Sequence, residues 1–260
     1  MATTRILNCI PSKDKQDDWK IEKAQAKGYL PKEMVVPKRV DLRKDWWKAG
    51  NQGTTGSCVG WATASSLLRF HFTKARKIKN TEKISVRFAW MASKEMDEYT
   101  EYPTTFIDDA GTSLKTALKT AHKIGALKAD LFPFHGKMVT IKEANFLKIA
   151  GKLKIKAYFN LIDRRQDKLT IFKAWLANNG PILTALDCDH AWFNVKRDGL
   201  LEKYDAKSAE GGHAVSIVGY TPTHFIIRNS WGPGWGDKGF AYASYDYAKR
   251  AFKEAYGIVV

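Results

Sequence analysis

A cysteine, a histidine and an asparagine in this sequence could together form a nucleophilic catalytic site. Cys58 follows a loop rich in Gly and Thr (residues 51–57) and begins an apolar helical pattern. The N–H groups and the dipole at a helix start stabilise a thiolate, which is the reactive form of cysteine. A buried, inert thiol is the usual alternative for a free cysteine. We favour that alternative for Cys9 and Cys188, and for Cys58 alone both interpretations stay open.

A thiolate nucleophile needs a general base, and the base needs a group that orients its ring. His213 is the best placed of the six histidines, because it follows a Gly-Gly pair and begins an apolar strand pattern. Asn229 ends the next predicted strand, and a four-residue turn brings the far ends of these two strands side by side. We therefore predict that Asn229 orients the His213 imidazole, while the Trp231 indole shields their hydrogen bond. Surface or capping roles are expected for His71, His122, His135 and His224, and His190 is expected in a loop after a strand.

Two weaker patterns lack the structural context that their chemistry needs. Residues 232–239 form a glycine-rich run that resembles a phosphate loop, but no helix follows it. Residues 187–190 contain Asp, Cys, Asp and His, but no second ligand pair accompanies them at zinc spacing. We therefore expect no nucleotide, no metal ion and no cofactor beyond a reduced thiol.

The elements that must position these residues change character along the chain. Apolar residues recur at three- and four-residue spacing in the first half, which predicts helices at 58–72, 86–99 and 113–124. The second half is richer in strands, predicted at 152–157, 182–186, 213–220, 225–229 and 240–245, with a helix at 169–178. This order predicts an α+β protein of two lobes with a cleft between them.

Residues 1–38 differ from the rest of the chain. They are charged and interrupted by three prolines, and a short helix at 19–26 would present little apolar surface. We therefore interpret residues 1–38 as an extension that does not belong to the core.

Composition excludes several classes of protein. With 260 residues, of which 44% are hydrophobic and 27% charged, the chain has enough apolar material for one large domain or two small lobes. Three cysteines are too few for a disulfide framework and fit the cytoplasm or another reducing compartment. No apolar stretch approaches the roughly 18 residues of a membrane span, and residues 1–19 lack a secretory signal pattern. Export by a route without such a signal stays open.

The chain is strongly basic. It has 43 Lys and Arg against 27 Asp and Glu, a formal charge of +16, which favours acidic partners. Lysines alternate with apolar residues at 152–157, a pattern more typical of a solvated face than of a nucleic-acid site. We therefore do not expect nucleic acid as the main partner.

Three ordered blocks resemble the signature motifs of the papain-like cysteine peptidases. They are Asn51-Gln52-Gly53-Thr54-Thr55-Gly56-Ser57-Cys58, Gly212-His213-Ala214-Val215 and Arg228-Asn229-Ser230-Trp231-Gly232-Pro233-Gly234-Trp235-Gly236. The resemblance runs from about residue 40 to residue 245. It implies an α+β papain-like fold, with a helical left lobe and a β-barrel-like right lobe on either side of the active-site cleft. The implied peptidase domain covers 39–260, with the helical lobe at about 39–135 and the β-rich lobe at about 136–260.

The resemblance also implies a role for each site residue. Cys58 is the nucleophile, His213 is the base and then the acid, and Asn229 is the orienting residue. The side-chain amide of Gln52 and the backbone N–H of Cys58 would form the oxyanion hole, whose donors must be fixed before the reaction. The implied substrate-binding residues are Gly111, beside the backbone of an extended substrate, Ala214 in the specificity pocket, and Trp231.

Several positions depart from the family pattern. Thr55 replaces the cysteine of a usual disulfide, and Val59 replaces an aromatic residue after the nucleophile. Gly212 stands where plant members carry Asp. Residues 1–38 are too short and too poorly patterned for the family's long helical prosegment, so we expect a short self-inhibitory or stabilising segment.

We expect a cysteine-type endopeptidase that acts as a monomer on protein or peptide substrates through an acyl-enzyme thioester. Three alternatives remain at this stage. The same triad could pass the acyl group to an amine, as a transpeptidase or ligase does. The scaffold could instead be a basic binding protein for nucleic acid or an acidic partner, although such a protein would not need all four chemical residues. A peptidase with one dedicated target inside another cell is the third alternative.

Overall fold

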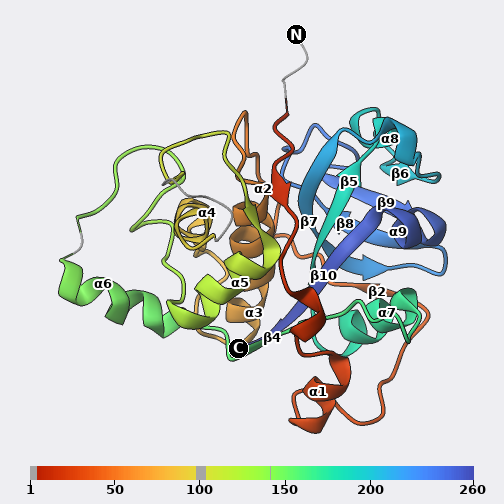
Figure 1. The fold of residues 1–260 in the computed structure, drawn as a ribbon, viewed down its shortest axis with the longest axis horizontal. Coiled ribbons are helices and arrows are strands. Elements are labelled where there is room, and N and C mark those ends of the chain that lie inside the picture. Colours follow the sequence, from red (N-terminus) through yellow and green to blue (C-terminus); the bar gives the residue numbers. More distant parts are fainter. Residues whose placement is uncertain (1–4, 98–103, 141) are drawn as a thin grey trace.

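The structure consists of a helical part and a sheet-rich part that lie side by side (Figure 1). It is a computed structural model, and it describes residues 5–97, 104–140 and 142–260. The helical part is arranged around one long helix that begins at Cys58, as predicted from the sequence. The consecutive sections of this helix are α2 (Cys58–Gly60), the π-helical η2 (Trp61–Leu68) and α3 (Arg69–Lys74).

Two further helices, α4 (Val86–Glu95) and α5 (Leu114–Lys123), pack against the long helix. Each begins after a serine whose hydroxyl accepts a backbone N–H of the first turn, which satisfies a donor that the helix leaves free. The helix predicted at 86–99 is shorter than expected, because α4 ends at Glu95. Its predicted last residues lie within 98–103, outside the described part of the chain.

The sheet-rich part contains, within the described residues, one sheet of eight strands. They follow the order β4, β10, β5, β7, β8, β9 and β6, and β2 also pairs with β7. Their bounds are β2 (Val40–Asp41), β4 (Ala157–Asn160), β5 (Ile182–Cys188), β6 (Leu200–Leu201), β7 (Gly211–Tyr220), β8 (His224–Arg228), β9 (Phe240–Ser244) and β10 (Phe252–Val259). Neighbours are antiparallel except β6 and β9, which are parallel. The predicted α+β fold is confirmed, and β7, which carries His213, has strand partners on both edges.

Apolar side chains are buried on both faces of this sheet. One cluster packs the sheet against α7 (Lys168–Asn178) and α9 (Tyr245–Ala251). A second cluster joins Ala214 and Tyr256 of the sheet to the long helix and α5, so it fixes the two parts together. The remaining short helical elements are α6 (Glu143–Ala150), α8 (His190–Phe193), η1 (Lys15–Asp17), η3 (Gly151–Leu153) and η4 (Ala206–Ser208). Among the described helices, none has the length and apolar composition needed to span a membrane.

The strand predicted at 152–157 is largely wrong, although its pattern of burial is right. Leu153, Ile155 and Ala157 are buried and the lysines between them are exposed. Residues 151–153 nevertheless form the 3-10 helix η3, and β4 begins only at Ala157. The reason is that Ala157 pairs with Val259, the last residue of β10, so the residues before it have almost no partner strand.

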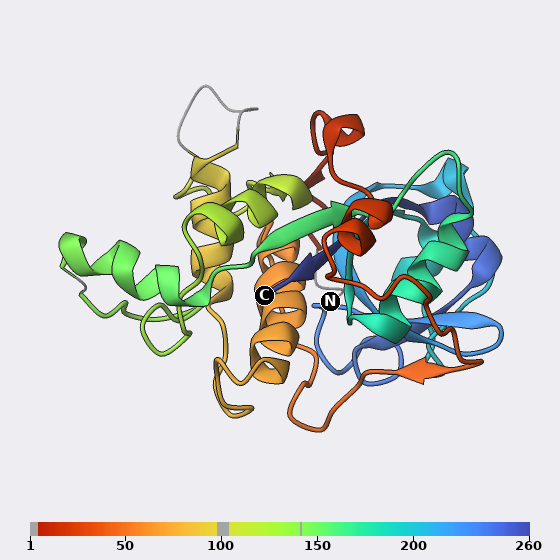
Figure 2. The ribbon, with the colours of Figure 1, turned by 90° about the horizontal axis from the view of Figure 1, so that it is seen from below.

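The N-terminal residues also differ from the prediction, because part of them lies in the core. The helix α1 (Ile21–Ala26) buries two residues three positions apart, and Leu30 follows them into the cluster that contains Trp175. Figure 2 shows α1 beside α7 and the end of β4. Three apolar side chains, those of Ile21, Ala24 and Leu30, are therefore enough to cover this part of the core. The charged composition of residues 1–38 obscures this short apolar pattern in the sequence.

Candidate active site

Cys58 lies at the start of the long helix and is fully buried. Gly60, two residues later, allows α4 to approach, since a Cβ there would lie 2.7 Å from the Cβ of Trp90. Burial raises the pKa of the Cys58 thiol to about 11, although the nearby backbone N–H groups of Ala214, Val59 and Asn8 act in the opposite direction. The thiol is therefore neutral in this structure, where water does not reach it.

His213 and Asn229 form the hydrogen bond that their strands predict. Nε2 of His213 lies 2.8 Å from Oδ1 of Asn229, and both residues are buried. The Trp231 ring packs 5.1 Å from the imidazole, centre to centre, and so keeps water away from this bond. Burial lowers the pKa of His213 to about 4; the Asn229 hydrogen bond opposes this change and the charge of Arg5 adds to it. Nδ1 of His213 is buried and has no hydrogen-bond partner in the described part of the chain.

Hydrogen bonds at both ends of its side-chain amide hold Gln52 in one orientation. Its Oε1 accepts from Oγ of Ser230 at 2.8 Å, and its Nε2 donates to the carbonyl of Thr55 at 2.9 Å. The backbone N–H of Gln52 also donates to the carbonyl of Ser230. The remaining Nε2 proton is directed at the carbonyl oxygen of Ile6, 3.4 Å away. The amide therefore presents a fixed donor next to the loop that ends at Cys58.

Residues 5–10, called the cleft segment below, cross the space between these side chains. The backbone N–H of Asn8 lies near the Cys58 sulfur and acts to lower its pKa, and the Asn8 side-chain amide donates to the carbonyl of Asp109 at 2.6 Å. The short strand β1 (Cys9–Ile10) then pairs in parallel with β3 (Thr112–Ser113) of the helical part. The cleft segment therefore covers the thiol and lies between the two parts of the molecule. The surface that it covers is called the groove below.

Glycines allow this close approach on both walls of the groove. A Cβ on Gly111 would lie 1.5 Å from the carbonyl oxygen of Asn8, and one on Gly212 would lie 2.5 Å from that of Cys9. A Cβ on Gly211 would likewise lie 3.0 Å from the Cβ of Leu7. An extended chain can therefore lie with its backbone flush against both walls.

The residues predicted to bind substrate all border this groove. Gly111 touches the cleft segment, Ala214 shares an apolar cluster with Cys9, and the Trp231 ring lies under the guanidinium of Arg5. The sequence reasoning missed Ser230, whose hydroxyl orients Gln52. It predicted a short self-inhibitory or stabilising segment within residues 1–38, but not which of these residues would lie over Cys58. No side-chain pattern marks residues 5–10, because they bind mainly through their backbone.

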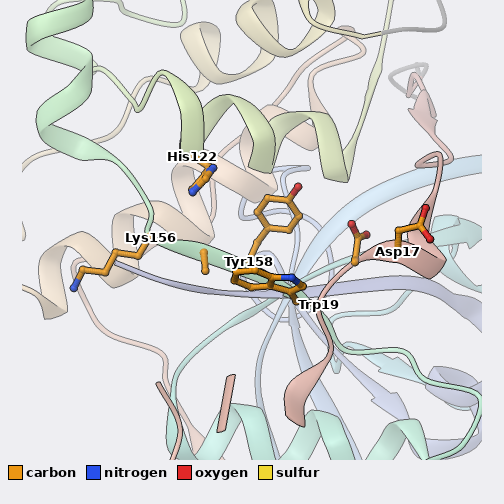
Figure 3. A pocket seen from close by; sticks show the side chains of 7 residues that line it. Asp17, Trp19, His122, Lys156 and Tyr158 are labelled. Atoms are coloured by element: carbon orange, nitrogen blue, oxygen red, sulfur yellow. The ribbon is translucent and has the colours of Figure 1, made fainter. Parts of the chain in front are cut away.

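The other two cysteines are free, buried thiols, and burial raises the pKa of each well above its usual value. A cavity of about 250 Å³ lies elsewhere, between residues 17–19, α5 and the start of β4. Figure 3 shows Trp19 and Tyr158 next to each other in it, with His122 approaching from α5. Its lining contains none of the candidate catalytic residues, so it is separate from the groove.

Comparison with known proteins agrees with this arrangement. The family model described as papain family cysteine protease matches residues 36–257. A cathepsin L-like protein of Caenorhabditis elegans is 26% identical over 224 residues, and mouse cathepsin K is 28% identical over 221 residues. These alignments cover 81% and 82% of this chain, but only 60% and 61% of the relatives.

Solved structures show the same fold. Xylellain, a cysteine protease from Xylella fastidiosa, superposes with a TM-score of 0.79 at 22% identity, covering 98% of this chain and 96% of Xylellain. A Carica candamarcensis cysteine protease in complex with E-64 superposes with a TM-score of 0.62 at 18% identity, covering 86% of this chain and 99% of that one. The family match extends over most of the chain and includes Cys58, His213 and Asn229. The chain belongs to the papain family of cysteine proteases.

Proposed function

We propose that this protein is a cysteine peptidase that hydrolyses peptide bonds through Cys58, His213 and Asn229. The observation that carries the proposal is the buried His213–Asn229 pair, 2.8 Å apart, whose histidine lies on β7, the strand that contacts the helix start at Cys58. Nδ1 of His213 has no other hydrogen-bond partner among the described residues, so it is free to take the thiol proton. Oδ1 of Asn229 then accepts from Nε2–H and stabilises the imidazolium.

The proposed reaction has two steps. The Cys58 thiolate attacks the substrate carbonyl, while Nε2 of Gln52 and the backbone N–H of Cys58 donate to the oxyanion. His213 returns its proton to the departing amine, which leaves a thioester on Cys58. Water, deprotonated by His213, then hydrolyses the thioester and restores the thiol. In support of this geometry, the groove already holds a peptide carbonyl, that of Ile6, against the Gln52 amide.

We further propose that the cleft segment restrains this activity. A substrate must lie where residues 5–10 lie, and the thiol is desolvated while the segment is in place. The segment is held from its C-terminal side, because Ser12 N–H donates to the buried Glu254 at 2.9 Å and Asp18 pairs with Lys115 at 2.8 Å. These anchors lie outside residues 5–10, so opening the groove does not require their loss.

The test compares the full chain, a variant without residues 1–10, and each of them with Cys58→Ala. Deleting only residues 1–10 keeps the Ser12 and Asp18 anchors and the core residues of α1. Each protein is incubated under reducing conditions with a peptide library and with E-64, and cleavage and labelling are read by mass spectrometry. We expect cleavage and labelling at Cys58 to be faster in the shortened protein and absent after Cys58→Ala.

Two results would contradict these proposals separately. Equal labelling and cleavage by the full and shortened proteins would remove the restraining role of the cleft segment but keep the peptidase. A shortened protein that is folded by circular dichroism, yet neither labels nor cleaves, would remove the peptidase itself.

A further inference from the structure

Arg5 occupies a small site of its own at one end of the groove. Its Nη1 donates to Oδ1 of Asn51 at 3.1 Å and to the carbonyl of Gly53 at 3.4 Å. Its Nη2 donates to the carbonyl of Trp231 at 3.2 Å, and the guanidinium carbon lies 5.4 Å from the centre of the Trp231 ring. One planar fork therefore reaches acceptors on two different loops and stacks over an indole, which a lysine ammonium could not do as fully.

The acceptors of this site are held in place independently of Arg5. The N–H of Gly53 donates to Oδ1 of Asn51 at 3.0 Å and fixes that side chain. The two loops are also joined, since Asn51 forms a β-bridge with Trp231 and the N–H of Gly232 donates to the carbonyl of Gly50. The site is thus preorganised, and a guanidinium that enters it needs little rearrangement of the protein.

The site lies on the leaving-group side of the candidate catalytic residues. Trp231 covers His213, the group that would protonate the departing amine, whereas Gly111 lies toward the other end of the cleft segment, beside Asn8. Arg5 immediately precedes Ile6, whose carbonyl faces Gln52. A side chain bound over Trp231 therefore belongs to the part of a substrate that follows the scissile bond.

We propose that Asn51, the carbonyls of Gly53 and Trp231, and the Trp231 ring form a guanidinium subsite that selects substrates with arginine just after the scissile bond. The inference rests on the proposed peptidase function and names part of its substrate class. Arg5 occupies the subsite in this structure as a side chain of the same chain. Side-chain recognition of this kind does not depend on the direction of the bound backbone, because the contacts are made by the guanidinium alone.

The test uses the full chain with Arg5→Ala, which empties the subsite. Matched fluorogenic peptides carry arginine, lysine or alanine after the scissile bond. The cleft segment lowers kcat/KM for all of them by the same factor, so the ratio between two peptides is independent of it. We expect the arginine peptide to exceed the alanine peptide by about tenfold in kcat/KM, with lysine between them. Adding Asn51→Ala should bring the ratio of the arginine peptide to the alanine peptide close to one.

A variant that should increase the preference for the arginine peptide gives a stricter test. Asn51→Asp keeps the Oδ1 acceptor and adds a negative charge, so it should raise the arginine ratio. Asn80→Asp makes the same charge change at an exposed position far from the groove and should leave the ratio unchanged. Equal turnover of the three peptides, or a ratio that Asn51→Ala does not change, would overturn the subsite while leaving the peptidase intact.

Binding gives a second readout that does not need turnover. In the full chain with Arg5→Ala and Cys58→Ala, the same peptides are titrated by fluorescence anisotropy. Tighter binding of the arginine peptide that is lost with Asn51→Ala supports the subsite even if the peptidase proposal fails. Indistinguishable affinities for the arginine and alanine peptides would overturn it.

Discussion

At the scale of single residues, the two side chains that would exchange a proton are both uncharged. Burial raises the pKa of Cys58 to about 11 and lowers that of His213 to about 4, so both groups are neutral around pH 7. The backbone N–H groups near the sulfur do not compensate for the water that a thiolate–imidazolium pair would lose in the covered groove. Removing the cover should therefore lower the thiol pKa and raise the imidazole pKa, which shifts the proton from sulfur to nitrogen.

This predicts a pH-dependent difference between the full chain and the protein without residues 1–10. At about pH 8 the full chain should contain almost no Cys58 thiolate, because that pH lies well below the raised pKa. The protein without residues 1–10 should show a clear thiolate signal at the same pH. The measurement is the ultraviolet thiolate absorbance of each protein minus that of its Cys58→Ala variant. Equal thiolate signals in both proteins would contradict the role of burial.

Ser230 offers a second prediction at this scale. Ser230→Ala removes the hydrogen bond to Oε1 of Gln52, so the amide should be able to turn away from the position proposed for the oxyanion. We expect kcat/KM to fall about tenfold, less than the loss typical of a missing oxyanion donor. Inhibition by peptide aldehydes, which form an oxyanion, should weaken in parallel, while iodoacetamide alkylation of Cys58 should not change. Ser93→Ala is a matched control, because Ser93 is a buried serine that bonds within α4. A similar loss in both variants would indicate general destabilisation instead.

At the scale of elements, the position of Cys58 depends on how closely two helices approach. Gly60 leaves no side chain between the long helix and α4, and its missing Cβ would also lie 2.9 Å from the carbonyl of Val86. Arg228 connects further elements from the end of β8. It is buried and donates to the carbonyls of Trp47 and Lys48, and it also bonds the serines of η2. The residue before Asn229 is thereby joined to the chain that leads to Gln52 and to the helix that follows Cys58.

Gly60→Ala should push α4 away from the long helix. Because the new Cβ meets a Cβ and a backbone carbonyl, neither of which can turn aside, we expect a loss of about 1–3 kcal/mol in the free energy of unfolding. Gly151→Ala is the control, since a Cβ there has its nearest neighbour at 3.9 Å. Chemical denaturation of both variants measures the difference. Unchanged stability after Gly60→Ala would show that the helices can separate without cost.

At the scale of elements, some parts of the fold and the candidate site can be predicted from the sequence and others cannot. The ordered blocks around Cys58, His213 and Asn229 suffice to predict the pair of His213 and Asn229, because a hairpin fixes both partners locally. The strand at 152–157 was misplaced because its length depends on where β10 ends, about a hundred residues later. The sequence does not predict which residues of the N-terminal extension lie over Cys58, or the burial of Ile21 and Leu30, for a related reason. Their partners are glycines and apolar residues distant in the chain, and charged neighbours hide their weak pattern.

At the scale of the whole molecule, the N-terminal residues join both parts and the core. They cover the thiol, pair with the helical part through β1, and cap the sheet through α1. Between these contacts lies a buried ion pair of Lys115 and Asp18, and Asp18 also accepts from the hydroxyl of Tyr256 at 2.8 Å. This cluster determines where the chain leaves the groove and turns toward the core.

Lys115→Met should be strongly destabilising for this reason. Of the two partners named above, the buried Asp18 carboxylate then keeps only the Tyr256 hydroxyl. Removing one partner of a buried ion pair typically lowers the free energy of unfolding by about 3–5 kcal/mol. Combining it with Asp18→Asn removes the uncompensated charge and should recover part of the loss. Urea denaturation of the two single variants and the double variant gives the coupling between them. Additive losses would show that the pair does not act as a unit.

The anchoring of the cleft segment just beyond residue 10 has a consequence for how it competes with substrate. Because Ser12 and Asp18 stay bound, residues 5–10 are a tethered ligand whose effective concentration in the groove is in the millimolar range typical of short linkers. Dilution of the protein therefore cannot release it, and the fraction of open molecules should be the same in a dilute sample and in a crowded one. A substrate that engages more of the groove than residues 5–10 do would displace the segment while it is bound. A cut between the segment and its anchors would open the site permanently.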